Sequence, residues 1–94
     1  MSIVVVVRFP VPRQTLLDWA KDNIELLAPI RALFEKHGRI SHRVISSETE
    51  FLDLDEWPSR DAYAAFKAEA GPMIEVFEST FGHRSTDAIY DLVG

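Results

Sequence analysis

The chain has 94 residues, enough for one domain spanning residues 1–94 with one modest hydrophobic core. Its formal net charge is −5 and its basic residues are scattered singly, which argues against nucleic acid or an anionic membrane surface as a partner. Cysteine is absent, which excludes disulfides, thiolate catalysis and cysteine-based metal sites.

The first predicted element is a strand from Ile3 to Val7, made only of β-branched residues. Neighbouring residues of a strand face opposite sides of the sheet, so both faces of this strand must be apolar and something must cover each of them. The run is short, lacks a preceding basic region and meets Arg8, which argues against a signal peptide or a membrane span. We therefore expect a soluble, cytoplasmic protein.

The next element is predicted to be helical. After a capping residue at Thr15, apolar residues follow a 3.6-residue period: Leu17, Ala20, Ile24, Leu27 and Phe34. Pro29 interrupts this run because it has no N–H for the carbonyl of Glu25, so we expect a kink or two consecutive helices that meet near Leu27. His37-Gly38 is predicted to end the run, with the glycine in the left-handed conformation.

Two strands are predicted next, Arg39 to Ser47 and Phe51 to Glu56, joined by a polar connection of hairpin length. The connection lacks an Asn-Gly pair that would settle the turn type, so two registers stay open. A two-residue loop pairs His42 with Asp55, whereas a three-residue loop pairs Arg43 with Asp55.

The second helix is predicted to begin at Ser59, which can cap it, and to run to about Ala70. Gly71-Pro72 is expected to break it, after which it restarts at the proline and stops at Gly82. The last strand is predicted to be Ala88 to Val93.

This order of elements predicts an α+β fold. It is a ferredoxin-like βαββαβ unit, in which helices cover one face of a four-stranded antiparallel sheet. The other face would leave the valine-rich strand in water. Two sheets packed face to face would remove this apolar area from water, so we predict a homodimer.

Three segments carry a resemblance to a known family: Gly38 to Arg43, Leu54 to Ser59 with its Glu-Trp pair at a strand-to-helix corner, and Phe66 to Phe77. In these segments the chain resembles the antibiotic-biosynthesis-monooxygenase family of dimeric α+β barrel proteins. The resemblance implies a dimeric α+β barrel with a small-molecule pocket between sheet and helices in each subunit. Family members often have a histidine where this chain has Phe66, and its absence argues against haem degradation.

His42 is the first candidate for catalysis, because an imidazole titrates near neutral pH and can act as acid or base toward a phenolic or enolisable substrate. A carboxylate at Asp55, if it lies opposite, would orient the ring and support its protonated form. We predict these two residues as the catalytic pair. The alternative is a structural histidine, half-buried and bonded to a neighbour or to the dimer partner.

Asp53 and Asp55 are two residues apart in a strand, so their side chains share a face about 6–7 Å apart. The spacing suits paired carboxylates or a cation, but the three histidines are far apart in sequence and we predict no metal site. The alternative is an acidic sheet edge or dimer rim, paired with Arg8 or Arg43. Glu56 either ends the buried stretch or enters the pocket.

Aromatic and apolar side chains near the corner and in the second helix could line a pocket for a flat substrate. The predicted substrate-binding residues are Trp57, Tyr63, Phe66, Met73 and Phe77, with Trp19 as a further candidate. The alternative is that they form the core. His37 is interpreted as a favourable charge at a helix C-terminus, His83 as a loop residue, and Tyr90 as a ligand donor or an exposed hydroxyl.

No nucleotide-binding loop, nucleophile elbow or flavin fingerprint occurs in the chain, so no cofactor is predicted. Oxygen chemistry would require the substrate anion itself to give an electron to oxygen. Two hypotheses follow. The first is a homodimeric, cofactor-independent monooxygenase, isomerase or cyclase acting on an aromatic or polyketide-like molecule; the second is a non-catalytic ligand-binding or dimeric interaction module.

Overall fold

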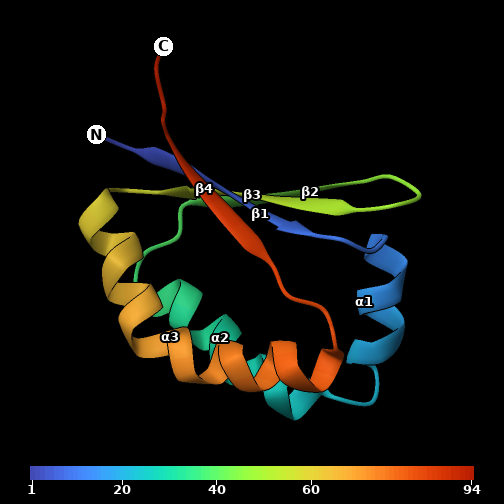
Figure 1. Ribbon diagram of the computed structural model, residues 1–94. Helices are drawn as coiled ribbons and strands as arrows, with labels where there is room; N and C mark the ends of the chain where they lie inside the picture. Colours follow the sequence, from blue (N-terminus) through green and yellow to red (C-terminus); the bar gives the residue numbers. More distant parts are fainter.

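The computed structural model describes all 94 residues. Its elements, in chain order, are β1 (Ile3–Phe9), α1 (Arg13–Ala20), α2 (Ile24–Lys36), β2 (Ser41–Ser46), β3 (Phe51–Trp57), α3 (Arg60–Phe81) and β4 (Thr86–Asp91). The strands form one antiparallel sheet in the order β2-β3-β1-β4, and the three helices all lie on one side of it (Figure 1). The predicted ferredoxin-like α+β fold is therefore confirmed.

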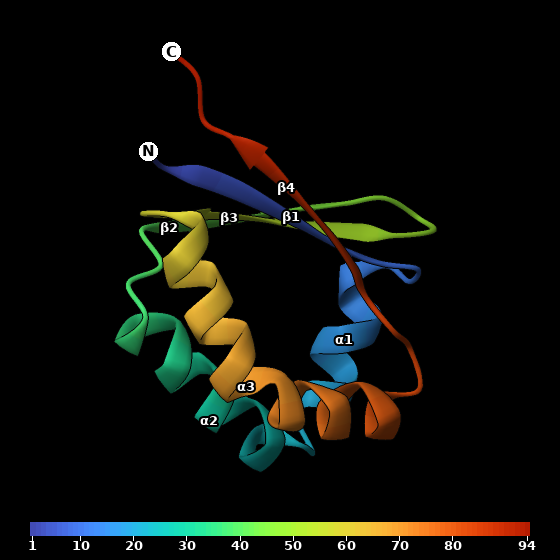
Figure 2. The same ribbon diagram turned by 60° about the vertical axis from the view of Figure 1, so that its left-hand side comes forward.

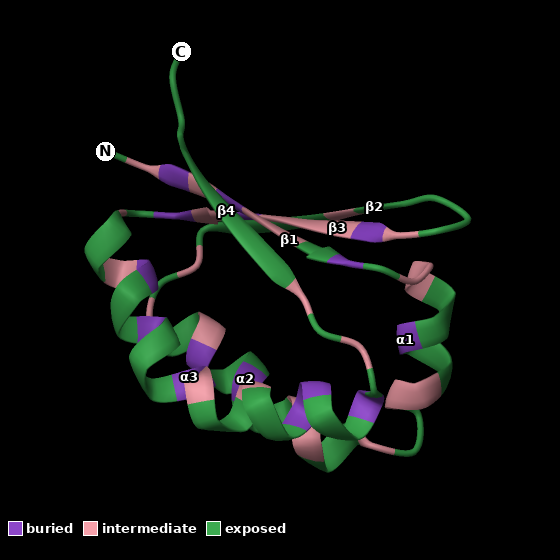
Figure 3. Cartoon of the chain, in the orientation of Figure 1, coloured by how far each residue is buried: buried purple, intermediate pink, exposed green.

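β1 lies inside the sheet, between β3 and β4, and its side chains alternate between the two faces. Ile3, Val5 and Phe9 are buried beneath the sheet, on the side that the helices cover. Val4 and Val6 point to the uncovered side and are only partly buried. Figure 3 shows this alternation along β1, next to an edge strand, β4, that is exposed throughout. We call the covered side the inner face and the uncovered side the outer face.

The hairpin has the two-residue loop, and its register therefore pairs His42 with Asp55. Ser47 closes the turn, because its backbone N–H donates to the carbonyl of Glu50. The predicted bounds of all four strands are wrong by one or two residues: β1 continues to Phe9 and β3 to Trp57. β2 begins at Ser41 rather than Arg39, and β4 covers residues 86–91 rather than 88–93, because its pairing with β1 extends to polar positions.

The first helical run forms two helices, but they do not meet near Leu27 as expected. The break lies at residues 21–23, between α1 and α2. Asn23 explains its position, because the side-chain amide donates to the backbone carbonyl of Trp19 and so satisfies the end of α1.

Pro29 is accommodated inside α2. It is exposed, so the carbonyl of Glu25 that it leaves without a helical partner lies on the water-facing side of the helix. Thr15 is not the cap that the sequence suggested. Pro12 occupies the cap position and α1 begins directly after it, with the N–H of Thr15 bonded to the carbonyl of Pro12.

α3 runs without interruption from Arg60 to Phe81, so the predicted break at Gly71-Pro72 is wrong. A proline in a helix interior removes one backbone hydrogen bond and bends the helix, and α3 changes direction partway along its length (Figure 2). Ala70 and Phe77, on either side of the bend, are both buried. Packing of both halves on one core therefore keeps the helix continuous.

The predicted helix ends are confirmed at three positions. The Ser59 hydroxyl accepts a hydrogen bond from the backbone N–H of Ala62 at 3.1 Å, which caps the start of α3. Gly38 and Gly82 follow α2 and α3 with φ angles of 84° and 86°, in the left-handed region that favours glycine. None of the helices combines the length and the apolar character that crossing a membrane would require.

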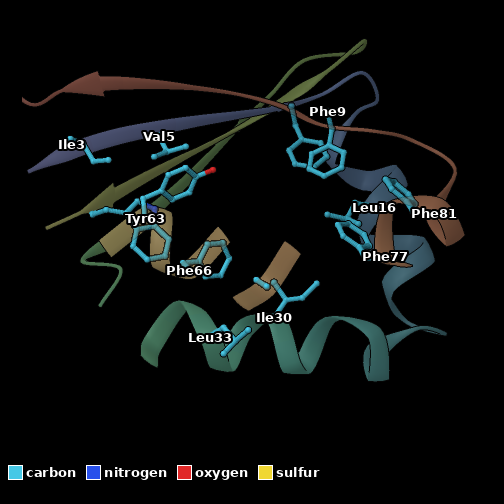
Figure 4. Close-up of a cluster of buried hydrophobic side chains, with 13 residues drawn as sticks. Ile3, Val5, Phe9, Leu16, Ile30, Leu33, Tyr63, Phe66, Phe77 and Phe81 are labelled. Carbon is cyan, nitrogen blue, oxygen red and sulfur yellow. The ribbon is translucent and has the colours of Figure 1, made fainter. Parts of the chain in front are cut away.

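The aromatic side chains of the core form two groups, at opposite ends of the space between sheet and helices (Figure 4). One group packs around the end of β3 and the start of α3 and contains Phe34, Trp57, Tyr63 and Phe66. The other packs around the end of β1 and contains Phe9, Trp19, Phe51, Phe77 and Phe81.

Candidate functional site

A cavity of about 430 Å³ lies between the inner face of the sheet and the helices. It exceeds the roughly 300 Å³ at which small-molecule sites begin. Its apolar wall includes Val7, Leu27, Ile30, Phe34 and Ile74, and its polar groups come from the strands β2, β3 and β4 as well as from the helices. The cavity thus combines an apolar body with a few converging polar groups, as binding sites for small molecules usually do.

His42, Asp53 and Asp55 form the polar centre of this cavity. The register of β2 and β3 sets His42 opposite Asp55, and the period of the strand puts both carboxylates on the inner face. The imidazole Nδ1 lies 3.0 Å from Asp55 Oδ1, in hydrogen-bond geometry, and 2.6 Å from Asp53 Oδ1. Because carboxylates accept, Nδ1 is the nitrogen that carries the proton in these contacts, which leaves Nε2 for another partner.

Arg39 supports the cluster from the loop before β2. Its Nη1 lies 3.3 Å from Asp55 Oδ1 and 3.5 Å from His42 Nδ1, and its guanidinium stacks over the ring of Phe34 at 3.8 Å from the centroid. The Asp55 side chain is only 4% exposed. A buried carboxylate needs a counter-charge and hydrogen bonds, and Arg39 and His42 supply both.

Asp53 has a different environment from Asp55. Burial first, and then the charge of Asp55, raise the pKa of Asp53 to about 6, although His42 and Arg13 act in the opposite direction. The 2.6 Å contact with His42 lacks the direction of a hydrogen bond, so Asp53 Oδ1 is buried without a hydrogen-bond partner. The pKa of this carboxyl therefore lies much closer to neutral pH than that of an ordinary aspartate.

A second polar group lies on the β4 side of the cavity. The Tyr63 hydroxyl donates to Asp87 Oδ2, and Lys67 Nζ lies 3.5 Å from the same oxygen. The hydrogen bond from Tyr63 lowers the pKa of Asp87, while burial and this same bond raise the pKa of Tyr63. Tyr63 is therefore a neutral hydrogen-bond donor, held in place by an ionised carboxylate.

The ligand-type atoms of His42, Asp53 and Asp55 lie within 4.8 Å of one another, which is close enough for a metal ion. The guanidinium of Arg39, however, lies within hydrogen-bond distance of Asp55 and 3.5 Å from the His42 nitrogen. A fixed positive charge at this place opposes a second cation. The arrangement suits proton exchange better than metal binding.

Five of the seven predicted site residues line the cavity: His42, Asp55, Tyr63, Phe66 and Phe77. Trp57 does not. It is completely buried behind Tyr63 and Phe66, in ring contact with both.

Met73 also lies outside the cavity, with 37% of its surface exposed. The sequence suggested a helix that restarts at Pro72, but α3 continues through Pro72. The continuous helix determines which residues of the following turns face the sheet. Ala70, Ile74 and Phe77 occupy the inner side of α3 at helical spacing, so Met73 falls beside them rather than among them. Ile74 takes the place in the wall that was expected for Met73.

The alternative of an acidic sheet edge or dimer rim is wrong, because Asp53 and Asp55 both point into the cavity. Arg8, one of the expected partners, pairs with Glu50 instead. Glu56 lies on the outer face, where Ser41 donates to it, so it does not enter the pocket.

Other candidates lie away from the cavity. Tyr90 is on the outer face and 58% exposed, and His37 pairs with Glu69 at 2.8 Å near the end of α2. His83 lies in the loop before β4, edge-on to Phe81.

Sequence reasoning missed several residues that line the cavity, among them Arg13, Arg31, Arg39, Lys67 and Asp87. Each is an isolated charge at the end of an element or on a helix, and such charges usually face water. Asp87 could have been found only from its pairing with Val7 of β1, which puts it on the inner face. The strand predicted from the sequence began at residue 88 and so left Asp87 out.

No protein-family model matches the chain, and no curated protein matches it either. Solved structures do match. A variant of SnoaB from Streptomyces nogalater, a cofactor-independent oxygenase, is 16% identical with a TM-score of 0.69, over 99% of this chain and 94% of that one. The monooxygenase ActVA-Orf6 of Streptomyces coelicolor, in complex with nanaomycin D, is 21% identical with a TM-score of 0.67, over 99% and 88% of the two chains.

A dimeric ferredoxin-like protein from an uncultured marine organism is 12% identical with a TM-score of 0.65, over 99% of this chain and 95% of that one. The matches also include a protein described as an antibiotic biosynthesis monooxygenase. At these identities the likeness is one of fold. The chain has the ferredoxin-like fold of these oxygenases and monooxygenases, which confirms at the level of the fold the resemblance seen in its sequence.

Proposed function

We propose that the protein is a cofactor-independent enzyme that removes a proton from an aromatic or polyketide-like substrate, as the first step of an oxygenation, isomerisation or cyclisation. The observation that carries the proposal is the meeting of His42 and Asp55 in a cavity of about 430 Å³. Structural neighbours that are oxygenases of this type support it.

In the proposed step, His42 Nε2 takes the proton of a phenolic or enolic O–H group, while Asp55 holds the ring through Nδ1. The substrate keeps the electron pair of the broken O–H bond and becomes an anion. Arg13 and Arg31 also line the cavity and have no carboxylate partner, so their charges favour the anionic form of a bound substrate. The aromatic wall holds the flat part of the molecule by ring contacts.

Oxygenation would follow without a cofactor if the substrate carries a CH₂ group activated by this anion, as an anthrone does. The anion gives an electron to molecular oxygen, the CH₂ carbon becomes a carbonyl, and the second oxygen atom leaves as water with the two hydrogens. All the electrons that oxygen takes up come from that carbon. In this reaction the protein supplies proton transfer, orientation and an apolar cavity.

We also propose that two copies pack through their outer faces. Residues that point away from the helices include Val4, Val6, Leu52, Leu54 and Ala88, and no element of the chain covers them. Burying this area against a second copy would remove it from water at about 25 cal/mol per Å² before association costs. The dimeric ferredoxin-like neighbour supports a dimer.

A second candidate function is a non-catalytic ligand-binding module. The observation that favours it is the closed network of Arg39, His42 and Asp55, which would satisfy a buried carboxylate even if no reaction took place. The two functions differ in what the loss of His42 does.

The test begins with thermal-shift measurements of wild type with dihydroxynaphthalene and dihydroxyanthraquinone, since a ligand that binds the native state raises its melting temperature. Turnover is then followed with a dihydroxyanthrone, by quinone absorbance and oxygen uptake. For an enzyme, His42→Ala lowers kcat by about 10²–10⁴-fold when it is assayed at a temperature at which the variant stays folded. His83→Ala, a histidine outside the cavity, is the matched control and keeps full activity.

A binding module has no turnover to lose. His42→Ala destabilises the fold by about 1–3 kcal/mol for either function, because a buried carboxylate loses one of its partners, but in a binding module the ligand-induced shift is little changed. If no aromatic compound shifts the wild type and no turnover is found, the enzyme proposal is abandoned.

A further inference from the structure

We propose that Asp53 is the proton acceptor of the site, which takes the Nδ1 proton of His42 at the moment when Nε2 receives the proton of the substrate. Asp55 and Arg39, in contrast, only hold the imidazole in position. This inference rests on the proposed function. The two carboxylates that contact Nδ1 of His42 thereby have separate roles, proton acceptance for Asp53 and positioning for Asp55.

Geometry makes both carboxylates candidates for this task. Asp53 Oδ1 is 2.6 Å and Asp55 Oδ1 is 3.0 Å from the same nitrogen. The charge on Asp55 is matched by the guanidinium of Arg39, with a contact of 3.3 Å, and its side chain is almost fully buried. Protonation of Asp55 would leave that guanidinium without its counter-charge, so Asp55 is suited to stay ionised.

Asp53 has no arginine or lysine within ion-pair distance. Its Oδ1 is buried and has no hydrogen-bond partner, its side chain is 18% exposed, and it lines the cavity. A proton on this oxygen would relieve the repulsion between two neighbouring carboxylates. Asp53 Oδ1 is already 2.6 Å from Nδ1, so the transfer needs a rotation of the imidazole that directs Nδ1–H from Asp55 toward Asp53.

The transfer balances without any further reagent. The substrate O–H bond breaks and a new N–H bond forms at Nε2; the Nδ1–H bond breaks and an O–H bond forms on Asp53. The imidazole ends neutral, and the negative charge moves from Asp53 to the substrate oxygen. The step therefore creates no new pair of opposite charges in the buried site, as protonation of the imidazole alone would, and avoids the cost of such a pair in a medium of low polarity.

The charged groups that face Asp53 come from three elements: Asp55 from its own strand, His42 from β2 and Arg13 from α1. Burial and Asp55 favour the protonated carboxyl, while His42 and Arg13 favour the ionised one. The balance gives a pKa of about 6, which suits a base working near neutral pH.

Carboxyl-carbon NMR of ligand-free wild type gives the first test and needs no substrate. The account expects the Asp53 carboxyl to titrate near pH 6. Titration near the ordinary aspartate value of about 4 would overturn the inference, because the carboxylate would then be too weak a base to hold the proton. This result would leave the proposed function standing.

Kinetics with the dihydroxyanthrone give the second test. Asp53→Asn should lower kcat about 10- to 100-fold with little change in KM, and the loss of activity below about pH 6 should disappear. Asp53→Glu should restore part of kcat and the acid limb, whereas Asp55→Asn should keep the acid limb. If Asp53→Asn retains the wild-type kcat and pH profile, Asp53 is not the acceptor, even though His42 is catalytic.

Discussion

Both faces of the sheet depart at several positions from the pattern of an antiparallel sheet that is covered on one side only. A sheet covered on one side usually has apolar residues on the covered face and polar residues toward water. Here the covered inner face holds His42, Asp53, Asp55 and Asp87 among the aromatic rings. The uncovered outer face has valines and leucines at corresponding positions.

The charged residues on the inner face and the apolar residues on the outer face both cost free energy of folding, and the fold of a single chain does not explain why they are there. A carboxylate on the inner face loses hydration, and apolar area on the outer face stays in water. Both costs become understandable if the inner face serves a ligand and the outer face meets a second copy. Substitutions on the two faces should therefore have different consequences.

The first prediction compares two neighbouring valines of β1 that face opposite sides. Val5→Asp should destabilise the fold by more than about 3 kcal/mol, because an unpaired charge would enter the dry core, as urea unfolding would show. Val6→Asp should leave a folded chain but prevent the proposed dimer, whose interface should bury more than about 1,200 Å².

Sedimentation at micromolar concentration reports the assembly. Wild type should sediment as a dimer and Val6→Asp as a monomer. A monomeric wild type, or a dimer that survives Val6→Asp, would show that the outer face is not the interface.

The second prediction compares two arginines near β2 that lie on opposite faces. Arg39→Ala should cost about 3 kcal/mol of unfolding free energy, because it leaves the buried Asp55 without its cation. Arg43 pairs with outer-face Leu54 and has no carboxylate partner, so Arg43→Ala should cost less than about 0.5 kcal/mol. Equal effects of the two changes in urea titrations would remove the distinction between the faces.

The third prediction concerns pH. Because the pKa of Asp53 is raised from 3.8 to about 6 in the folded state, the native protein binds its proton more tightly than the unfolded chain. The contribution of Asp53 to stability is therefore fully present below pH 4 and is lost as pH rises toward about 6. Between these limits, wild type should lose up to about 3 kcal/mol relative to Asp53→Asn.

Unfolding free energies of both proteins, measured from pH 4 to pH 7, test this expectation. A difference that stays constant with pH would mean that the inner face does not disfavour the ionised Asp53. A difference that changes in the opposite direction would mean that His42 and Arg13 outweigh burial.

The fourth prediction serves as a reference that involves neither face. Ser59→Ala should cost about 1 kcal/mol, since it removes the hydroxyl that accepts from the N–H of Ala62 at the start of α3. It should leave assembly and ligand binding unchanged. An effect on either would indicate that small losses of stability alone can imitate the results above.

Much of the fold was predictable because it follows from local chemistry. The β-branched run of β1, the Ser59 cap and the two glycine helix ends are set by a few neighbouring residues. The break at Asn23 and the continuity of α3 through Pro72 were not predictable. They depend on a side chain bonding back to Trp19 and on packing against a distant part of the core.

The site was predictable in part for the same reason. The pairing of His42 with Asp55 followed from one of two hairpin registers, and strand alternation placed Asp53 on the same face. Which face that is, and which charges meet there, depends on tertiary structure. Arg39 reaches the cluster by stacking on Phe34 of α2, a contact between residues whose partnership no sequence spacing indicates.

The central claim is that the charged inner face is the ligand site and the apolar outer face is the contact between copies. Backbone amide NMR of wild type, titrated with dihydroxyanthraquinone, tests it most directly. We expect the signals of Val7, His42, Asp53 and Asp55 to move on titration, while those of Ile45 and Tyr90 on the outer face stay in place. Changes confined to the outer-face residues, or no change at any residue with any hydroxylated aromatic, would contradict it.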